Sequence, residues 1–271
     1  NNKMACKTGN GDLRDASQNL VTDDEQKANL LNDFFASVCT VDDGNTVAVD
    51  KEVPDGVVLD NIDFSIEAII KAIRRVKPKT TAGPDGFPPL LVKKLGQCLA
   101  FPLSLIFKSF MSVGRIPAVW KNATITPVFK GGLASDPGNY RPIALTSVFC
   151  KLMERVITSD ILQYCRKYNL ITDQQHGFLS KRSTVTNLLH CLNDWTCAIM
   201  NRHSVSVAYI DFKKAFDSVC HNKLLARLAS LGITGDLLEW VKDFLSDRQQ
   251  RTRDGSALSG PNNVNSGVIQ G

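Results

Sequence analysis

The sequence predicts an α+β fold in which helices pack on a small, mainly antiparallel sheet. Apolar residues recur at helical spacing over most of the 271 residues, and short β-branched stretches such as 124–130 and 204–210 interrupt that pattern. With 43% hydrophobic residues, the chain is long and apolar enough to bury a core in one or two domains.

The first half of the chain contains four predicted helices. Asp23 or Asp24 and Ser65 are suited to cap the first two, because their side-chain oxygens can accept hydrogen bonds from free backbone N–H groups. Pro78 and Gly114 are expected to end the second and the fourth. The helices are predicted over residues 24–39, 66–76, 90–95 and 99–113.

A β-hairpin with basic residues on both arms is predicted next. Residues 124–130 form the first arm, which we expect at a sheet edge because Pro127 has no N–H to donate. A glycine-rich turn over 131–138 leads to the second arm, 140–143. The remaining predicted elements are helices over 147–168, 184–201, 223–231 and 237–245, and a polar hairpin over 248–268.

The most informative segment follows the predicted strand 204–210. Asp211 stands at the strand end, and a helix is expected to begin near Ala215. From that position a carboxylate can hold Mg²⁺ through one oxygen, while phosphates and waters fill the other sites. On these residues alone, a surface turn remains an alternative interpretation.

Four further motifs surround this segment in a fixed order. They are Lys79-Thr80-Thr81-Ala82-Gly83-Pro84-Asp85-Gly86-Phe87, Asn139-Tyr140-Arg141-Pro142-Ile143, Gln174-Gln175-His176-Gly177-Phe178 with the residues up to Thr184, and Ser266-Gly267-Val268-Ile269-Gln270-Gly271. The series resembles the ordered motifs of reverse transcriptases, in particular those of non-LTR (LINE-type, jockey-like) retrotransposons. This resemblance covers the whole chain and implies the fingers and the first part of the palm of a right-hand polymerase.

The resemblance also implies a domain organisation and partners. The segments would be an acidic lead-in over 1–63, a fingers-like helical region with the hairpin over 64–203, and a partial palm over 204–271. RNA template, DNA primer and dNTP would be the partners. The chain opens on Asn1, and we expect it to be part of a longer polyprotein with an upstream endonuclease and with an aromatic-x-Asp-Asp hairpin and a thumb after Gly271.

Nucleotidyl transfer of this kind uses two divalent cations about 3.5 to 4 Å apart. The resemblance implies two Mg²⁺ ions in the complete polymerase, with Mn²⁺ as a substitute. Asp211 and the backbone of Phe212 would be ligands, and the other carboxylates would come from the later hairpin. The paired aspartates at 23–24 and 42–43 lack the neighbouring aromatic, and a helix cap and a turn explain them better.

Nucleotide contacts are implied at several positions. Lys130 and Arg141 would grip the triphosphate, and Phe216 would lie under the incoming sugar and exclude a 2′-hydroxyl. Gln270 would contact the nucleotide and the template, although Ile269 stands where the family usually has proline. The backbone from Phe212 through Lys213 and Lys214 to Ala215 could cradle phosphate oxygens. Surface cations and an ordinary core phenylalanine are the structural alternatives.

A template-tracking role is implied for the motif before the second long helix, where cations would meet phosphates and an aromatic could stack. Its residues are Gln175, Gly177, Phe178, Lys181, Arg182 and Ser183. Alternatively, the motif is a turn that leads into a helix. Structural roles are expected for Asp217, Gly83, Pro84, Asp85 and Gly86.

Charge and cysteine content limit the cellular setting. Residues 1–63 contain 5 Lys/Arg and 13 Asp/Glu, whereas the rest contains 27 and 14, so the body of the chain is basic and suited to a polyanion. The eight cysteines form no Cys-x-x-Cys pair, which favours reduced thiols in a nuclear or cytoplasmic protein. We expect no membrane span and no secretion leader.

Two other functions remain open from the sequence. One is a catalytically inactive remnant that only binds nucleic acid. The other is a group II intron-type maturase, whose core motifs are related.

Overall fold

A computed structural model describes residues 9–39, 52–212 and 214–269, and its architecture is α+β, as predicted. The chain forms two compact units, Asn1–Ile161 with Lys214–Gly271, and Leu162–Lys213. The predicted segments 1–63, 64–203 and 204–271 were defined by charge and sequence motifs, whereas these units are defined by contacts in the structure. The predicted segments therefore stay a prediction.

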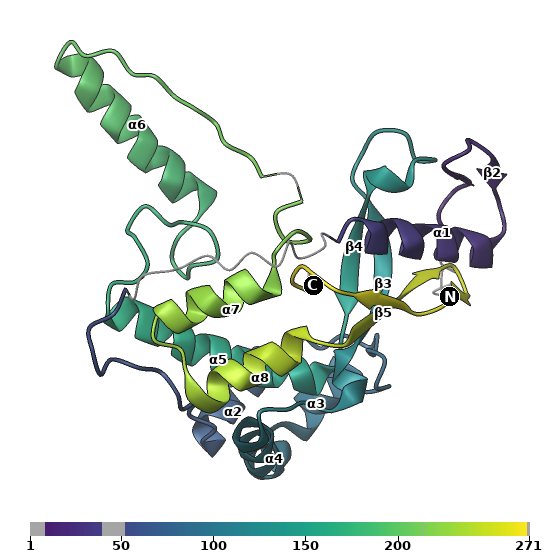
Figure 1. Cartoon of the computed structure of the whole chain (residues 1–271), viewed down its shortest axis with the longest axis horizontal. Coiled ribbons are helices and arrows are strands. Elements are labelled where there is room, and N and C mark those ends of the chain that lie inside the picture. The colour runs from purple at the N-terminus through teal and green to yellow at the C-terminus, as the bar shows by residue number, and fades with distance from the viewer. Residues whose placement is uncertain (1–8, 40–51, 213, 270–271) are drawn as a thin grey trace. The chain divides into compact units, whose positions relative to one another are not determined.

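The first unit contains most of the helices (Figure 1). Asp23 caps the first helix through a 2.9 Å bond from Gln26 N–H, and Ser65 caps the second through a 3.2 Å bond from Ala68 N–H. Gly114 ends the fourth helix in a left-handed conformation, so all three local signals are confirmed. The helices are α1 (Asp24–Ser37), α2 (Ile66–Arg74), α3 (Pro89–Leu95), η1 (Gly96–Leu99), α4 (Ala100–Val113), η2 (Ala118–Lys121), η3 (Pro137–Asn139), α5 (Val148–Lys167), which continues into the second unit, α7 (His221–Ser230) and α8 (Gly235–Leu245).

The main sheet has the order β4-β3-β5-β6, with β7 also paired to β5. Its strands are β3 (Asn122–Phe129), β4 (Tyr140–Leu145), β5 (Arg248–Asp254), β6 (Ala257–Leu258) and β7 (Asn262–Val264), while β1 (Leu13–Arg14) and β2 (Leu20–Val21) pair separately. The hairpin of β3 and β4 is confirmed. The pair of β3 and β5 is parallel, whereas the other strand pairs are antiparallel.

The prediction that residues 124–130 form an edge strand is wrong, because β3 lies between β4 and β5. Pro127 is tolerated there for two reasons. The pairing with β5 ends at Ile125, and on the other side Pro127 stands opposite Pro142. Lys130 N–H donates to Asn139 O, and alternation along the ladder therefore makes the proline pair a non-hydrogen-bonded one.

Two hydrophobic clusters stabilise the first unit. The larger one contains Phe64, Ile69, Phe107, Leu152 and Trp240 and joins α2, α4, α5 and α8. The smaller one packs α1 against the sheet, where Leu31 and Phe35 meet Ile125 and Tyr140. The N-terminal helix therefore contributes to the core that supports the sheet.

A buried lysine also joins α1 to β5. Lys27 lies 2.8 Å from an Asp24 carboxylate oxygen and 3.5 Å from one of Asp254. Burial by itself would lower the pKa of Lys27, but the hydrogen bond with Asp24 and the charges of both aspartates raise it above the ordinary value.

The helical run Pro89–Val113 is long and apolar enough to cross a membrane by length and composition, which we did not expect from the sequence. Core helices of soluble proteins pass the same test. Here η1 (Gly96–Leu99) interrupts the run. Leu103, Phe107 and Met111 are buried, whereas Phe101, Leu105 and Val113 are exposed, and 28% of the apolar window is buried inside the structure.

The second unit contains α6 (Thr184–Met200), and no side chain of this helix is buried within the chain. Residues 203–212 form no strand, so the predicted strand over 204–210 is wrong for this structure. The helix expected near Ala215 is also absent, because residues 214–218 form a turn and α7 begins only at His221.

Candidate functional site

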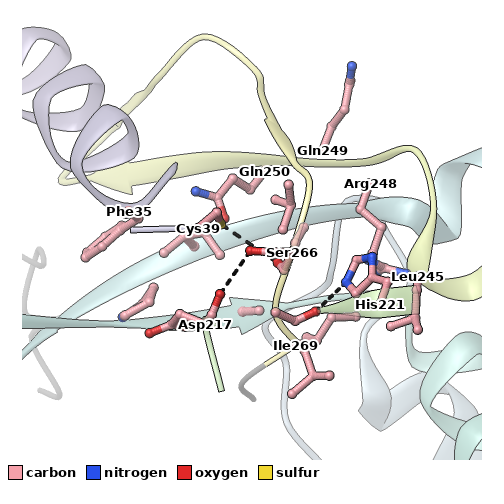
Figure 2. A pocket seen from close by; sticks show the side chains of 17 residues that line it. Phe35, Cys39, Asp217, His221, Leu245, Arg248, Gln249, Gln250, Ser266 and Ile269 are labelled. Atoms are coloured by element: carbon pink, nitrogen blue, oxygen red, sulfur yellow. Dashed lines mark hydrogen bonds between the residues drawn. The ribbon is translucent and has the colours of Figure 1, made fainter. Parts of the chain in front are cut away.

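A pocket in the first unit lies between the sheet and the loop that precedes Gln270 (Figure 2). Its empty volume is about 670 Å³, which includes space open to the solvent. Most of its wall is apolar, and polar groups gather where the loop approaches the turn of Asp217 and the start of α7. The lining residues are Phe35, Cys39, Ala123, Ile125, Pro142, Ala144, Asp217, His221, Leu245, Arg248, Gln249, Gln250, Val264, Ser266, Gly267, Val268 and Ile269.

Hydrogen bonds join the loop 266–269 to the turn 214–219. Gly267 N–H donates to Val219 O at 2.8 Å, and Val268 N–H donates to Phe216 O at 2.9 Å. The Ser266 hydroxyl donates to Asp217 O at 3.1 Å. Two motifs that are far apart in the sequence therefore form one backbone junction, which we call the turn–loop junction.

Gly267 is required by the geometry of this junction. Its φ is +81°, and a Cβ at this position would lie 2.9 Å from the Cα and the carbonyl oxygen of Asp217 and from the carbonyl oxygen of Phe216. These are backbone atoms, so they cannot move aside as a flexible side chain could. Only glycine lets the two segments approach so closely.

His221 Nε2 lies 2.8 Å from Gly267 O. A carbonyl oxygen only accepts, so Nε2 is the donor in this bond. Cys39 Sγ, 3.8 Å from Ser266 O, adds a weaker contact from the end of α1. Figure 2 shows the bond from His221 to the loop and the bond from the Ser266 side chain, on the loop, to Asp217.

The wall contributed by β5 is polar. Arg248 is buried and donates to Phe244 O at 2.7 Å and to Trp120 O at 3.1 Å, and burial lowers its pKa. Gln250 is also buried, and its Nε2 has no hydrogen-bond partner among the described residues.

Lys130 and Arg141 lie toward the turn end of the β3–β4 hairpin, and both are exposed. Arg141 is paired with Val128, and Lys130 stands two residues beyond Val128. Residues two apart on a strand point to the same face, so Lys130 and Arg141 share one face of the hairpin. They can approach one anion together.

The Gly83–Gly86 segment is a tight turn against the start of α5. Gly86 N–H donates to Gly83 O at 3.1 Å, and the Asp85 carboxylate accepts from Phe87 N–H at 3.2 Å. A Cβ on Gly83 would lie 2.4 Å from Thr146 O. Pro84 lies within the turn. These contacts are structural in kind.

The proposed template motif lies in the second unit. Phe178 is 88% exposed, and Lys181 is also exposed. Arg182 contacts Asp173, while Ser183 caps α6 by accepting from Thr186 N–H at 3.2 Å. The Gln175 side chain donates to Gly177 O at 3.1 Å. In this structure, the motif combines a helix start with an exposed ring and an exposed cation.

The residues implied as nucleotide and metal contacts are divided between the two units, because Asp211 and Phe212 belong to the second unit and Phe216 and Lys214 to the first. Phe216 is 41% exposed. Lys214 and Ala215 lie in the turn, and Lys214 Nζ is 5.7 Å from the centre of the Phe34 ring. Lys213 and Gln270 lie outside the described residues. Asp211 and Phe212 are exposed.

The described residues do not fit a pair of metal ions. Within the described ranges, no group of three or more His, Cys, Asp or Glu side chains could hold one. A single carboxylate at Asp211 is too few for two hard cations. We therefore derive no chemical step through a metal from these residues.

Sequence reasoning missed His221, Arg248 and Gln250 as pocket residues, and it named Ser266 only as the first residue of a motif. No spacing pattern marks them, because they meet only through the parallel pairing of β3 with β5 and through the turn–loop junction. The glycine at 267 was the available signal, since an isolated glycine near a motif often marks a close backbone approach.

The chain belongs to the reverse transcriptase (RNA-dependent DNA polymerase) family, whose model matches residues 128–271, more than half of the sequence. Both the hairpin strand with Arg141 and the turn–loop junction lie inside this match. The resemblance seen in the ordered motifs is thereby confirmed.

The similar proteins come from non-LTR retrotransposons. The chain is 29% identical over 207 residues to the probable RNA-directed DNA polymerase from transposon BS of Drosophila melanogaster, which covers 76% of the chain and 23% of that protein. It is 31% identical over 209 residues to the RNA-directed DNA polymerase from mobile element jockey of the same species, with 76% and 23% covered. The Drosophila funebris jockey polymerase is 26% identical over 247 residues, with 90% and 27% covered. The chain thus spans about a quarter of the length of these relatives.

Proposed function

We propose that the protein is part of an RNA-directed DNA polymerase of a non-LTR retrotransposon, which extends a DNA primer with dNTPs on an RNA template. The observation that carries the proposal is the turn–loop junction. In a chain of the reverse transcriptase family, it fixes the loop before Gln270 against the turn that contains Phe216. The turn that carries the proposed nucleotide contact Phe216 and the loop 266–269 therefore share one backbone support.

Several further site residues have proposed roles within this function. Lys130 and Arg141 hold the triphosphate, since a guanidinium fork matches phosphate oxygens in a bidentate manner. Phe216 excludes the 2′-hydroxyl, and the backbone of residues 212–215 contacts phosphate oxygens. Phe178 and Lys181 follow the template through stacking and a phosphate contact.

The metal and the wider setting are also proposals. Reverse transcriptases use divalent metal ions, and we propose Mg²⁺ with Asp211 and the Phe212 backbone among its ligands, completed by residues outside the described set. Such ions neutralise charge on the transferred phosphate. We further propose a polyprotein that also contains an endonuclease, acting in the nucleus or the cytoplasm.

Arg141 offers the sharpest test of the triphosphate contact. The experiment uses the protein encoded by the whole open reading frame, with an RNA template, a DNA primer and dNTPs. Arg141→Ala should reduce dNTP incorporation about 30- to 1,000-fold, because it removes a charge-assisted contact worth about 2 to 4 kcal/mol in the transition state. Affinity for primer-template should change far less, and Arg141→Lys should restore only part of the rate.

Arg253 provides the matched control, because it is an exposed arginine on β5 of the same sheet. Arg253→Ala should leave incorporation within about twofold of the parent. The same result for Arg141→Ala would show that the hairpin is not the triphosphate clamp. A folded parent that binds RNA but incorporates nothing would instead indicate a nucleic-acid-binding remnant.

A further inference from the structure

His221 is a half-buried imidazole in the pocket for which the family motifs and the proposed function supply no role. It is the first residue of α7, directly after the cap residue Cys220. The backbone here is held by the helix, since Leu224 N–H donates to Cys220 O at 3.0 Å. The ring is therefore presented from a rigid element.

The bond from His221 acts on a single peptide unit. The carbonyl of Gly267 accepts from His221 Nε2 at 2.8 Å, and the N–H of the same peptide unit, on Val268, donates to Phe216 O at 2.9 Å. A planar peptide held at both its oxygen and its nitrogen cannot rotate about the flanking bonds. Two elements, α7 and the turn 214–219, thus fix one peptide plane.

This restraint is needed because of the glycine beside it. Gly267 has access to a wider range of backbone conformations than any other residue, so a single hydrogen bond from the Val268 N–H restrains this peptide less than a bond at each end of it. Among the described residues, His221 is the donor that holds this carbonyl. The peptide that it fixes lies just before Val268 and Ile269, which lead to Gln270.

We infer that His221 is a positioning residue, which anchors the Gly267–Val268 peptide and so holds the loop 266–269 against Phe216, a proposed nucleotide contact. This inference rests on the proposed function. It assigns His221 no contact with substrate. The effect on the nucleotide passes through the loop, and the same peptide ties that loop to Phe216.

Hydrogen exchange of backbone amides tests the anchor in this chain without any activity assay. His221→Leu removes the donor with a similar side-chain volume, and His221→Gln places an amide N–H where Nε2 stood. We expect the Val268 amide to exchange about tenfold faster in His221→Leu, because one hydrogen bond of ordinary strength is lost. His221→Gln should stay within about threefold of the parent.

The other amides distinguish anchoring from general damage. In His221→Leu, the amides of α8 should exchange at the parent rate. Equal acceleration in the loop and in α8 would show that His221 only stabilises the fold, and an unchanged Val268 amide would show that the bond does not hold the loop. Either result overturns the inference.

The functional arm uses the protein encoded by the whole open reading frame. His221→Leu should raise the KM for dNTP about three- to tenfold, with affinity for primer-template unchanged. His221→Gln should have a KM for dNTP close to that of the parent. An unchanged KM beside faster loop exchange overturns the role toward the nucleotide. A parent without incorporation overturns the proposed function and that role with it, whereas the exchange result still decides whether His221 anchors the loop.

Discussion

Residues 204–212 and the turn 214–219 are neighbours in the sequence, but among the described residues only the turn has its backbone held by hydrogen bonds to another segment. The first segment is apolar and strand-like in composition, yet it forms no strand, and Tyr209 and Ile210 are 88% and 81% exposed. The second is a turn of mixed polar and apolar residues, and its carbonyl groups receive hydrogen bonds from the loop 266–269. Intrinsic residue preferences alone would have predicted regular structure in residues 204–212 and an irregular backbone in residues 214–219.

The difference shows what each kind of element requires. A turn can be completed by a few local bonds and one glycine, and the loop 266–269 supplies its remaining partners. A strand instead needs a neighbour along its length, because without one its backbone N–H and C=O groups have no partner in a sheet. Among the described residues, no strand pairs with 204–210.

The largest effect that we expect in this comparison comes from Gly267→Ala. The new Cβ would meet backbone atoms at 2.9 Å, and alanine is strained at a φ of +81°. Steric overlap and backbone strain together should destabilise the junction by about 2 to 4 kcal/mol. Hydrogen exchange of the Gly267 and Val268 sites, compared with urea unfolding of the whole chain, measures this loss.

Gly56 is a matched control for this substitution. Its φ is also +81°, but nothing lies within 4 Å of its virtual Cβ. Gly56→Ala therefore carries the strain without the overlap, at about 1 to 2 kcal/mol. If the two substitutions cost the same, close approach is not what makes residue 267 a glycine.

The helices could be predicted from the sequence because their signals are local. Asp23, Ser65 and Gly114 lie within a few residues of the backbone groups that they satisfy, and each acts as predicted. The glycine-rich hairpin of β3 and β4 was predictable for the same reason. By contrast, the central position of β3 depends on its parallel pairing with β5, which no local pattern encodes.

The site could be predicted only in part, again for physical reasons. The motifs indicated which segments carry Phe216 and Gly267, but the sequence does not state that one peptide unit joins them. His221 follows from the fold alone, since its ring meets Gly267 only after α7 is placed. The strand prediction before Asp211 was wrong because β propensity largely measures packing against neighbouring strands.

Ser266→Ala should have a smaller effect than Gly267→Ala. It measures how much one side-chain hydrogen bond contributes to holding the turn 214–219. Ser266 is 3% exposed, and its hydroxyl donates to Asp217 O. Loss of one neutral hydrogen bond should cost about 1 kcal/mol, measured by urea unfolding. Ser112, an exposed serine bonded to the carbonyl of Ser109 in its own helix, is the control and should cost less than about 0.5 kcal/mol as alanine. Equal costs would mean that the junction is no more ordered than a helix surface.

The smallest effect should come from the apolar segment, where Ile210→Ser is compared with Ile125→Ser. Ile125 is 3% exposed in β3, so burying a hydroxyl and leaving a cavity there should cost about 3 kcal/mol or more. Ile210 is 81% exposed, and its replacement should change the free energy of unfolding by less than about 0.5 kcal/mol. Urea unfolding of the two variants beside the parent gives both values. A cost at Ile210 that approaches the cost at Ile125 would mean that 204–210 is a buried strand in solution, and the contrast between the two neighbouring segments would then disappear.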